Sequence, residues 1–238
     1  MSDLGATVEV KYDGVLRHFG AGDLVDLALD RIAPVRISKA YPGRRNYSGV
    51  YWARTTGRHH WFESLYEKSA LTALDRDPAI VNIATQPFRV SRGGRKGHVP
   101  DILAERVDRS RLLVDVRPRP RITERALVTF EMTATWCSSL AIDYRLFADL
   151  SKVQDWNLRL LAGYRYARWC CPQPVAQLLA QRAGEVRPLR DWARLFDGAD
   201  IPTRGLLLAA IWHGALDVDL SERLELDVDA VCTGRGWT

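Results

Sequence analysis

The sequence predicts an α/β protein: a mixed sheet flanked by helices, followed by a small winged-helix-like domain. Short apolar runs that alternate with polar residues or end at turn signals recur through residues 8–116 and indicate strands. Residues 61–75 carry apolar side chains at helical spacing, and a second helix is predicted over residues 122–138. Beyond Arg168, proline and glycine separate three short helical segments from a final hairpin. Strands and helices in this order are typical of a sheet covered by helices.

Each element rests on a local pattern. Residues 8–12 alternate up to Asp13-Gly14, a pair typical of hairpin turns, and residues 15–19 form the return strand. The first long helix ends at Asp77-Pro78. Further strands are predicted at residues 80–83, 86–90, 99–104, 112–116 and 140–147. The C-terminal helices are predicted at residues 174–183, 188–196 and 202–214, and the hairpin at 216–220 and 224–229, turning at Ser221 to Arg223.

The composition is that of an ordinary globular chain: 47% of the 238 residues are apolar, enough for a core. No apolar run reaches the roughly 18 residues of a membrane span, and the first residues lack a signal-peptide pattern. The four cysteines form no Cys-x-x-Cys pair, so they predict neither a zinc site nor disulfides. We therefore expect a cytoplasmic protein that does not bind membranes. The expected domains are a β-rich extension that packs on the core (1–43), a core domain (44–167) and the winged-helix-like domain (168–238).

The positive charge is concentrated in two runs. Residues 31–60 contain seven Lys or Arg, two His and no acid, with aromatic residues interleaved, and residues 89–98 form a second acid-free run. This pattern suits the phosphate backbone of a nucleic acid, whereas a solvated loop surface is the alternative. The residues that we expect to contact DNA are Arg44, Arg45, Arg54, Arg58, His59, His60, Arg92, Arg95 and Lys96.

Three acids in the core domain indicate a metal site. Asp101 follows a proline at a predicted strand start, and Asp115 lies inside the next strand, where an unpaired carboxylate costs several kcal/mol. Alternate residues of a strand share a face, so Arg117 points to the same side as Asp115. An acid on the preceding helix completes the set of oxygen ligands that Mg²⁺ prefers. For Asp115 the alternative is a salt bridge to a nearby arginine.

Several residues near these acids each have two possible interpretations. Glu63 and Glu67 are four residues apart and share a helix face, so spacing does not choose between them. Either acid also suits a solvated helix surface. Gln86 is a candidate donor behind the ligands or an ordinary loop amide, and Lys96 is a candidate ammonium for the site.

In their order and spacing, these motifs resemble the TnsA-like endonuclease subunits of heteromeric transposases, a branch of the PD-(D/E)xK nuclease superfamily. The resemblance covers about residues 44–165. It is carried by His59-His60, Ser64-Leu65-Tyr66-Glu67, Gln86-Pro87-Phe88, His98-Val99-Pro100-Asp101 and Asp115-Val116-Arg117-Pro118.

The resemblance implies a restriction-endonuclease-like fold and selects Glu67 over Glu63, which remains a supporting residue beside Gln86. The implied catalytic set is Glu67, Asp101, Asp115 and Arg117, and the ligands of Mg²⁺ (or Mn²⁺) are Glu67, Asp101, Asp115 and the Val116 carbonyl. Implied partners are transposon-end DNA, a DDE-type transposase that cuts the other strand, and an AAA+ ATPase regulator that contacts the C-terminal part. Arg117 departs from the family's lysine: a guanidinium cannot act as a base, although it can stabilise developing charge.

The C-terminal hairpin is acidic. Residues 215–231 hold six acids against one base, Arg223. Phosphate would repel such a surface, so we expect it to dock protein through Asp217, Asp219 and Asp227, with an unused acidic surface as the alternative.

For the whole chain we expect a Mg²⁺-dependent DNA endonuclease that cuts at transposon ends together with a partner transposase. The alternatives are a weakened nuclease fold that serves as a DNA-binding scaffold, and a free-standing restriction or repair endonuclease.

Overall fold

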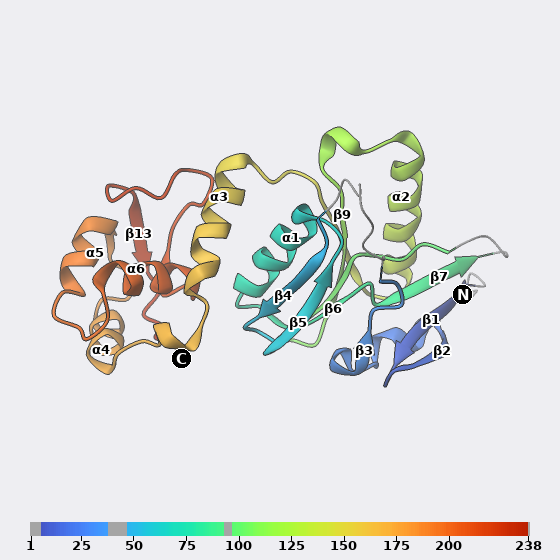
Figure 1. The fold of residues 1–238 in the computed structure, drawn as a ribbon, viewed down its shortest axis with the longest axis horizontal. Coiled ribbons are helices and arrows are strands. Elements are labelled where there is room, and N and C mark those ends of the chain that lie inside the picture. The colour runs from blue at the N-terminus through green and yellow to red at the C-terminus, as the bar shows by residue number, and fades with distance from the viewer. Residues whose placement is uncertain (1–5, 38–46, 93–96, 238) are drawn as a thin grey trace. The chain divides into compact units, whose positions relative to one another are not determined.

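The computed structural model describes residues 6–37, 47–92 and 97–237, which form two compact units, Met1–Asp149 and Leu150–Thr238. Each unit is described by itself. The first contains strands β1 to β10 with helices α1 and α2, and the second contains α3 to α6 with β11 to β13 (Figure 1). The unit boundary precedes the expected one at residue 168, because Leu161 of α3 packs into the core of the C-terminal helices.

The N-terminal hairpin is confirmed. Strands β1 (Ala6–Tyr12) and β2 (Val15–Gly20) pair antiparallel, and Tyr12 faces Val15 across the turn. The turn residues Asp13 and Gly14 both have positive φ angles, 51° and 77°, as a tight hairpin turn requires. On its other side β1 pairs with β7 (Phe88–Arg92), and at its end it pairs with β3 (Ile32–Ala33).

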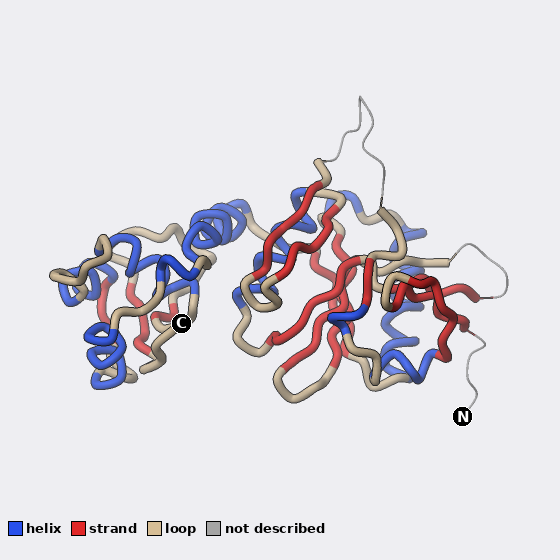
Figure 2. Tube along the Cα trace, turned by 60° about the horizontal axis from the view of Figure 1, so that its bottom comes forward, coloured by secondary structure: helices blue, strands red, loops and turns tan. Residues whose placement is uncertain are grey.

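The central sheet is mixed, as predicted. Its strand order is β10-β9-β8-β6, with β6 at Ile80–Thr85, β8 at Ile102–Arg106, β9 at Arg111–Val116 and β10 at Asp143–Phe147. Strand β10 runs parallel to β9, and the other neighbours are antiparallel. Figure 2 shows strands as red tubes and helices as blue ones. The connection between β9 and β10 is α2 (Glu124–Ser139). The first unit is therefore an α/β structure.

Alternation along β9 directs its side chains to two cores. Leu112 and Val114 pack with α1 (Leu65–Arg76), whereas Leu113 packs with Trp136 of α2 and with the N-terminal strands. Helices therefore cover both faces of the sheet. The N-terminal strands contribute Val8 and Val10 to the core that contains Leu113 and Trp136.

The structure contains a hairpin that the sequence did not predict. Strands β4 (Gly49–Ala53) and β5 (Arg58–Phe62) form a two-stranded sheet within the basic run. The predicted helix start at Trp61 is wrong, because Trp61 belongs to β5 and α1 begins only after its N-cap Ser64.

In the second unit, the three predicted helices are present as α4 (Gln173–Gln181), α5 (Leu189–Leu195) and α6 (Thr203–Trp212). The unit also contains α3 (Lys152–Leu161), a helix that was not predicted. Its sheet has the strand order β11-β13-β12, with β11 at Val186–Pro188, β12 at Leu216–Asp217 and β13 at Asp229–Cys232. The short 3₁₀ helices of the chain are Ala21–Val25, Leu29–Arg31, Arg119–Arg121, Ala162–Tyr164 and Ala167–Trp169.

The predicted C-terminal hairpin is wrong. Strand β12 is short and pairs with β13, so residues 218–228 form a loop between the two strands rather than two paired arms. The winged-helix-like arrangement stays a prediction. None of the described helices is long and apolar enough to cross a membrane.

Asp75 of α1 anchors the unexpected hairpin. Its buried carboxylate accepts hydrogen bonds from the Tyr51 hydroxyl at 2.8 Å and from the amides of Arg54 and Thr55 at 3.2 and 2.8 Å. We expect Asp75→Ala to lower the free energy of unfolding by about 2–4 kcal/mol, because three donors lose one charged acceptor. Tyr51→Phe, which removes one of the three donors, should cost about 1 kcal/mol. Urea denaturation measures both, and equal losses would contradict the anchoring role.

Candidate active site

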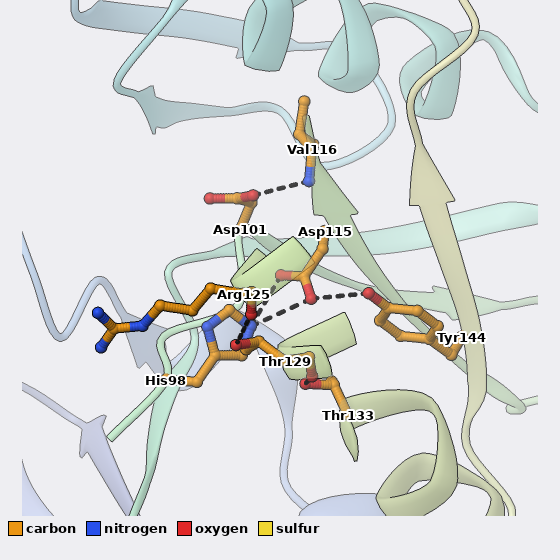
Figure 3. A network of polar contacts seen from close by, with 8 residues as sticks. All are labelled: His98, Asp101, Asp115, Val116, Arg125, Thr129, Thr133 and Tyr144. Carbon is orange, nitrogen blue, oxygen red and sulfur yellow. Dashed lines mark hydrogen bonds and ion pairs between the residues drawn. The ribbon is translucent and has the colours of Figure 1, made fainter. Parts of the chain in front are cut away.

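Asp101 is fixed at the point where β8 begins. Its Oδ2 accepts a hydrogen bond from the Val116 amide of β9 at 2.7 Å, and its backbone carbonyl accepts one from the Gln86 amide at 2.8 Å. The carboxyl is thus held beside the last residue of β9, with its second oxygen directed away from Val116 (Figure 3). The main chain, rather than a flexible side chain, positions this acid.

Asp115 is buried in β9, with 1% of its surface exposed. The His98 Nε2 lies 3.0 and 3.1 Å from its two carboxylate oxygens, and the Tyr144 hydroxyl of β10 donates to Oδ2 at 2.9 Å (Figure 3). Among the described residues the partners of Asp115 are therefore a histidine and a tyrosine, and none of the described arginines forms a salt bridge with it. Burial and the Asp115 charge raise the pKa of Tyr144 above its usual range, so this hydroxyl stays a donor.

Glu67 folds back on the start of α1. Its Oε2 accepts a hydrogen bond from the Glu63 amide at 2.7 Å and its Oε1 accepts one from the Ser64 hydroxyl at 3.0 Å, while the Glu67 amide donates to the Ser64 hydroxyl oxygen at 3.1 Å. This reciprocal arrangement caps the helix. The Ser-x-x-Glu motif therefore has a structural role in addition to any chemical one.

Glu63 is engaged elsewhere. Its carboxylate forms an ion pair with Arg36, with 2.8 Å between Oε2 and Nη2. Arg36 follows β3 in the chain. Its positive charge opposes the rise in the pKa values of Glu67 and Asp101. Glu63 thus holds a cation beside the acids, which suits the supporting role that the resemblance implied.

Asp101 lies within electrostatic reach of both Glu67 and Asp115. Burial raises the pKa of Asp101 well above its ordinary value, and the negative charges of Glu67 and Asp115 raise it further, against the Val116 hydrogen bond and Arg36. Burial also raises the pKa of Glu67, against its hydrogen bonds from the Glu63 amide and the Ser64 hydroxyl. Side chains from α1, from the residue before β8 and from β9 therefore share one electrostatic environment.

This arrangement fits a metal ion only in part. Asp101 and Glu67 offer the hard oxygen atoms that Mg²⁺ prefers, and a cation would offset the cost of clustering acids. Asp115 fits less well, because His98 and Tyr144 already bind its oxygens. Within residues 6–37, 47–92 and 97–237, no three His, Cys, Asp or Glu side chains are grouped so that they could hold a metal together. The Val116 carbonyl stays a predicted ligand.

Arg117 does not reach into the cluster. The side chain is exposed, and its Nε donates to the Arg121 carbonyl at 3.1 Å, while its amide donates to Phe147 of β10. In this conformation its guanidinium is bound to the loop that follows β9.

Gln86, the other supporting candidate, contacts Asp101 through its backbone. Its side chain is buried, its φ of 41° is positive, and its Oε1 has no hydrogen-bond partner among the described residues. The main-chain contact is the part of its supporting role that the structure defines.

The predicted DNA-contacting residues differ in their placement and exposure. Arg44, Arg45, Arg95 and Lys96 lie outside the described residues, and Arg92 is the last residue of β7. His59 is exposed, Arg54 is half-buried, and Arg58 contacts the backbone and carboxylate of Asp30. The prediction for His60 is wrong: this side chain is buried in β5 against the Thr56 hydroxyl, and burial lowers its pKa to about 4, so it is uncharged at neutral pH.

The predicted docking acids lie in the second unit. Asp217, Asp219 and Asp227 are all exposed, as a docking surface requires. Asp219 also accepts hydrogen bonds from the amide and hydroxyl of Ser221, and these bonds lower its pKa.

Sequence reasoning missed three residues of the site: Arg36, His98 and Tyr144. His98 opens the His-Val-Pro-Asp motif, which was a signal for it. Tyr144 and Arg36 carried no local signal, because their partners are distant in the chain. Comparison with known protein families and with curated proteins finds no match for this chain.

Asp101 should make stability depend on pH in a specific direction. Folding raises its pKa above the ordinary 3.8, so the folded protein binds the proton more tightly than the unfolded chain. The contribution of Asp101 to the free energy of unfolding is therefore most favourable when the acid is protonated. This contribution is lost as the pH rises from 3.8 through the folded pKa. Asp101→Asn keeps an oxygen for the Val116 amide but cannot ionise, so we expect this variant to be more stable than the wild type at neutral pH.

The measurement is the free energy of unfolding in urea between about pH 4 and pH 8. Asp26→Asn, at an exposed position where no described side chain pairs with the carboxylate, is the matched control and should follow the wild-type curve. If wild type and Asp101→Asn gave parallel curves, the proposed electrostatic cost of Asp101 would be contradicted.

Proposed function

We propose that this protein is a metal-dependent DNA endonuclease that acts as one subunit of a heteromeric transposase at transposon ends. The observation that carries the proposal is the placement of Asp101, whose half-buried carboxyl binds the Val116 amide next to Asp115 on β9 and lies within electrostatic reach of Glu67. These acids come from a helix, a strand start and the next strand, in the order of the nuclease family that the sequence resembles. The mixed sheet with helices on both faces supports a restriction-endonuclease-like core.

In this proposal Glu67 and Asp101 hold the ion, which is Mg²⁺ or Mn²⁺. When bound, such an ion polarises a phosphate and lowers the pKa of a water molecule. His98 and Tyr144 fix the orientation of Asp115, so its negative charge stays beside Asp101 without a mobile rotamer. The partners would be the transposase that cuts the other strand and an ATPase regulator.

Arg117 would contribute positive charge to the transition state and cannot serve as the base. In this role its guanidinium must leave the Arg121 carbonyl to reach a scissile phosphate. That movement is the step on which activity depends most in this proposal.

Removing the charge of Asp101 tests the ligand assignment. We expect Asp101→Asn to lower Mg²⁺-dependent nicking of transposon-end DNA by at least about a hundredfold, while DNA binding persists, because an amide is a poor ligand for the ion. Asp108→Asn, in the exposed turn between β8 and β9, should cut at the wild-type rate. The measurement is plasmid or oligonucleotide nicking with and without the partner transposase, beside a gel-shift assay. Full cleavage by Asp101→Asn would rule out this site.

The bond from Arg117 to the Arg121 carbonyl favours a second candidate, a nuclease fold that acts as a DNA-binding scaffold. Substitutions at Arg117 distinguish the two. For an active enzyme, Arg117→Ala should slow cleavage by about 10²–10³-fold and Arg117→Lys should retain part of the rate, because a lysine still supplies charge. Arg121→Ala, which keeps the carbonyl, is the control. A wild type that binds DNA and assembles with the transposase but does not cut would support the scaffold.

A further inference from the structure

The C-terminal unit contains a groove to which no function has been assigned above. Its volume is about 410 Å³, and it is lined by Lys152, Val153 and Trp156 of α3 and by residues 223–225 of the loop between β12 and β13. All of these residues belong to the same compact unit. The groove is a feature of that unit alone.

Trp156 is the largest apolar side chain at the groove and remains 56% exposed. Lys152 lies one helical turn before it, so the two side chains share a face of α3. A tryptophan left in solvent at a concave site is typical of a contact residue, because its large flat surface gains much on burial and loses little conformational freedom. A small apolar side chain would gain less there.

The loop opposite α3 is held at both ends. The buried Asn157, next to Trp156, donates through Nδ2 to the carbonyls of Leu220 and Glu222 at 2.9 and 2.6 Å. Beyond the groove, the carbonyls of Leu226 and Val228 accept hydrogen bonds from the first amides of α5, each at 2.8 Å. Residues 223–225 lie between these anchors. The groove is therefore largely formed in advance, which lowers the entropy lost on binding.

The charges on the walls select the kind of ligand. Lys152 and Arg223 form no ion pair within the described part of the chain, so both cations are available. Glu225 also lines the groove, and the same loop exposes Glu222 and Asp227. A nucleic-acid backbone would meet this acidic loop and be repelled. A short segment with one carboxylate can pair with the two cations and brings a single negative charge near the acids, whereas a nucleic-acid strand brings one with every phosphate.

We propose that this groove binds an extended peptide segment of a partner protein, in which a bulky apolar side chain packs on Trp156 and a neighbouring carboxylate pairs with Lys152 and Arg223. The site differs from the docking surface of Asp217, Asp219 and Asp227, whose charge is opposite. It also does not depend on nuclease activity, since none of its residues belongs to the acid cluster.

The test uses a display library of random twelve-residue peptides, selected against the full-length protein. Enriched peptides should carry Asp or Glu beside Leu, Ile, Met or an aromatic residue, and Trp156→Ala should weaken their binding at least about tenfold by fluorescence anisotropy. Selection against the double variant Lys152→Glu, Arg223→Glu should enrich Lys or Arg in place of the acid. Arg204→Gln, at an exposed position outside the groove lining, is the matched control and should bind as the wild type does.

Three results would overturn the proposal. The first is a selection that enriches no peptides, or peptides that bind Trp156→Ala as tightly as the wild type. The second is displacement of the bound peptide by single-stranded oligonucleotides, which would show a nucleic-acid site. The third is concentration-dependent dimerisation that Trp156→Ala abolishes, which would show that a second copy of the chain occupies the groove. Unchanged melting temperatures of the variants establish that each one is folded.

Discussion

The first unit is organised by the need to neutralise one buried carboxylate, Asp115. A charge inside a covered strand costs several kcal/mol unless donors satisfy it, and here the donors come from both sides of β9. His98 approaches from the segment before β8, and Tyr144 comes from β10. These contacts require β8, β9 and β10 to be neighbours in one sheet, and the same pairing brings Asp101 to the end of β9. The acid cluster is therefore a consequence of the strand order.

The cluster opposes the stability of the fold that creates it. Asp101 is half-buried near two negative charges, and the Val116 amide and the charge of Arg36 act against that cost. Stored electrostatic strain of this kind is common at sites where a ligand supplies the missing charge. Glu67 bears a smaller cost because its carboxylate lies at the N-terminus of α1, where the helix dipole favours an anion. The site combines one strained acid with two that the protein satisfies.

The parts of the fold that the sequence predicted are those governed by local periodicity. The first hairpin, α2 and the three C-terminal helices follow from alternation, helical spacing and proline signals. The β4–β5 hairpin was missed because its aromatic and basic residues suit a nucleic-acid surface equally well, although His60 turns inward. Residues 224–228 belong to no strand, and the carbonyls of Leu226 and Val228 bind amides of α5 instead, whereas Asp229 begins β13 and pairs with β11. In the site, the three acids were predictable from motif order, whereas Tyr144 and Arg36 act through partners that local patterns do not reveal.

Glu67 joins two tasks in one side chain. Its oxygens bind the Glu63 amide and the Ser64 hydroxyl just before α1, and its charge contributes to the environment of Asp101. A cation that draws this carboxylate away from the helix start would break its bonds with the Glu63 amide and the Ser64 hydroxyl. Order in the opening turn of the helix and occupancy of the cluster are thus thermodynamically linked, and each must influence the other by an equal free energy. The order of the first turn of α1 would therefore change when a cation binds at the acids.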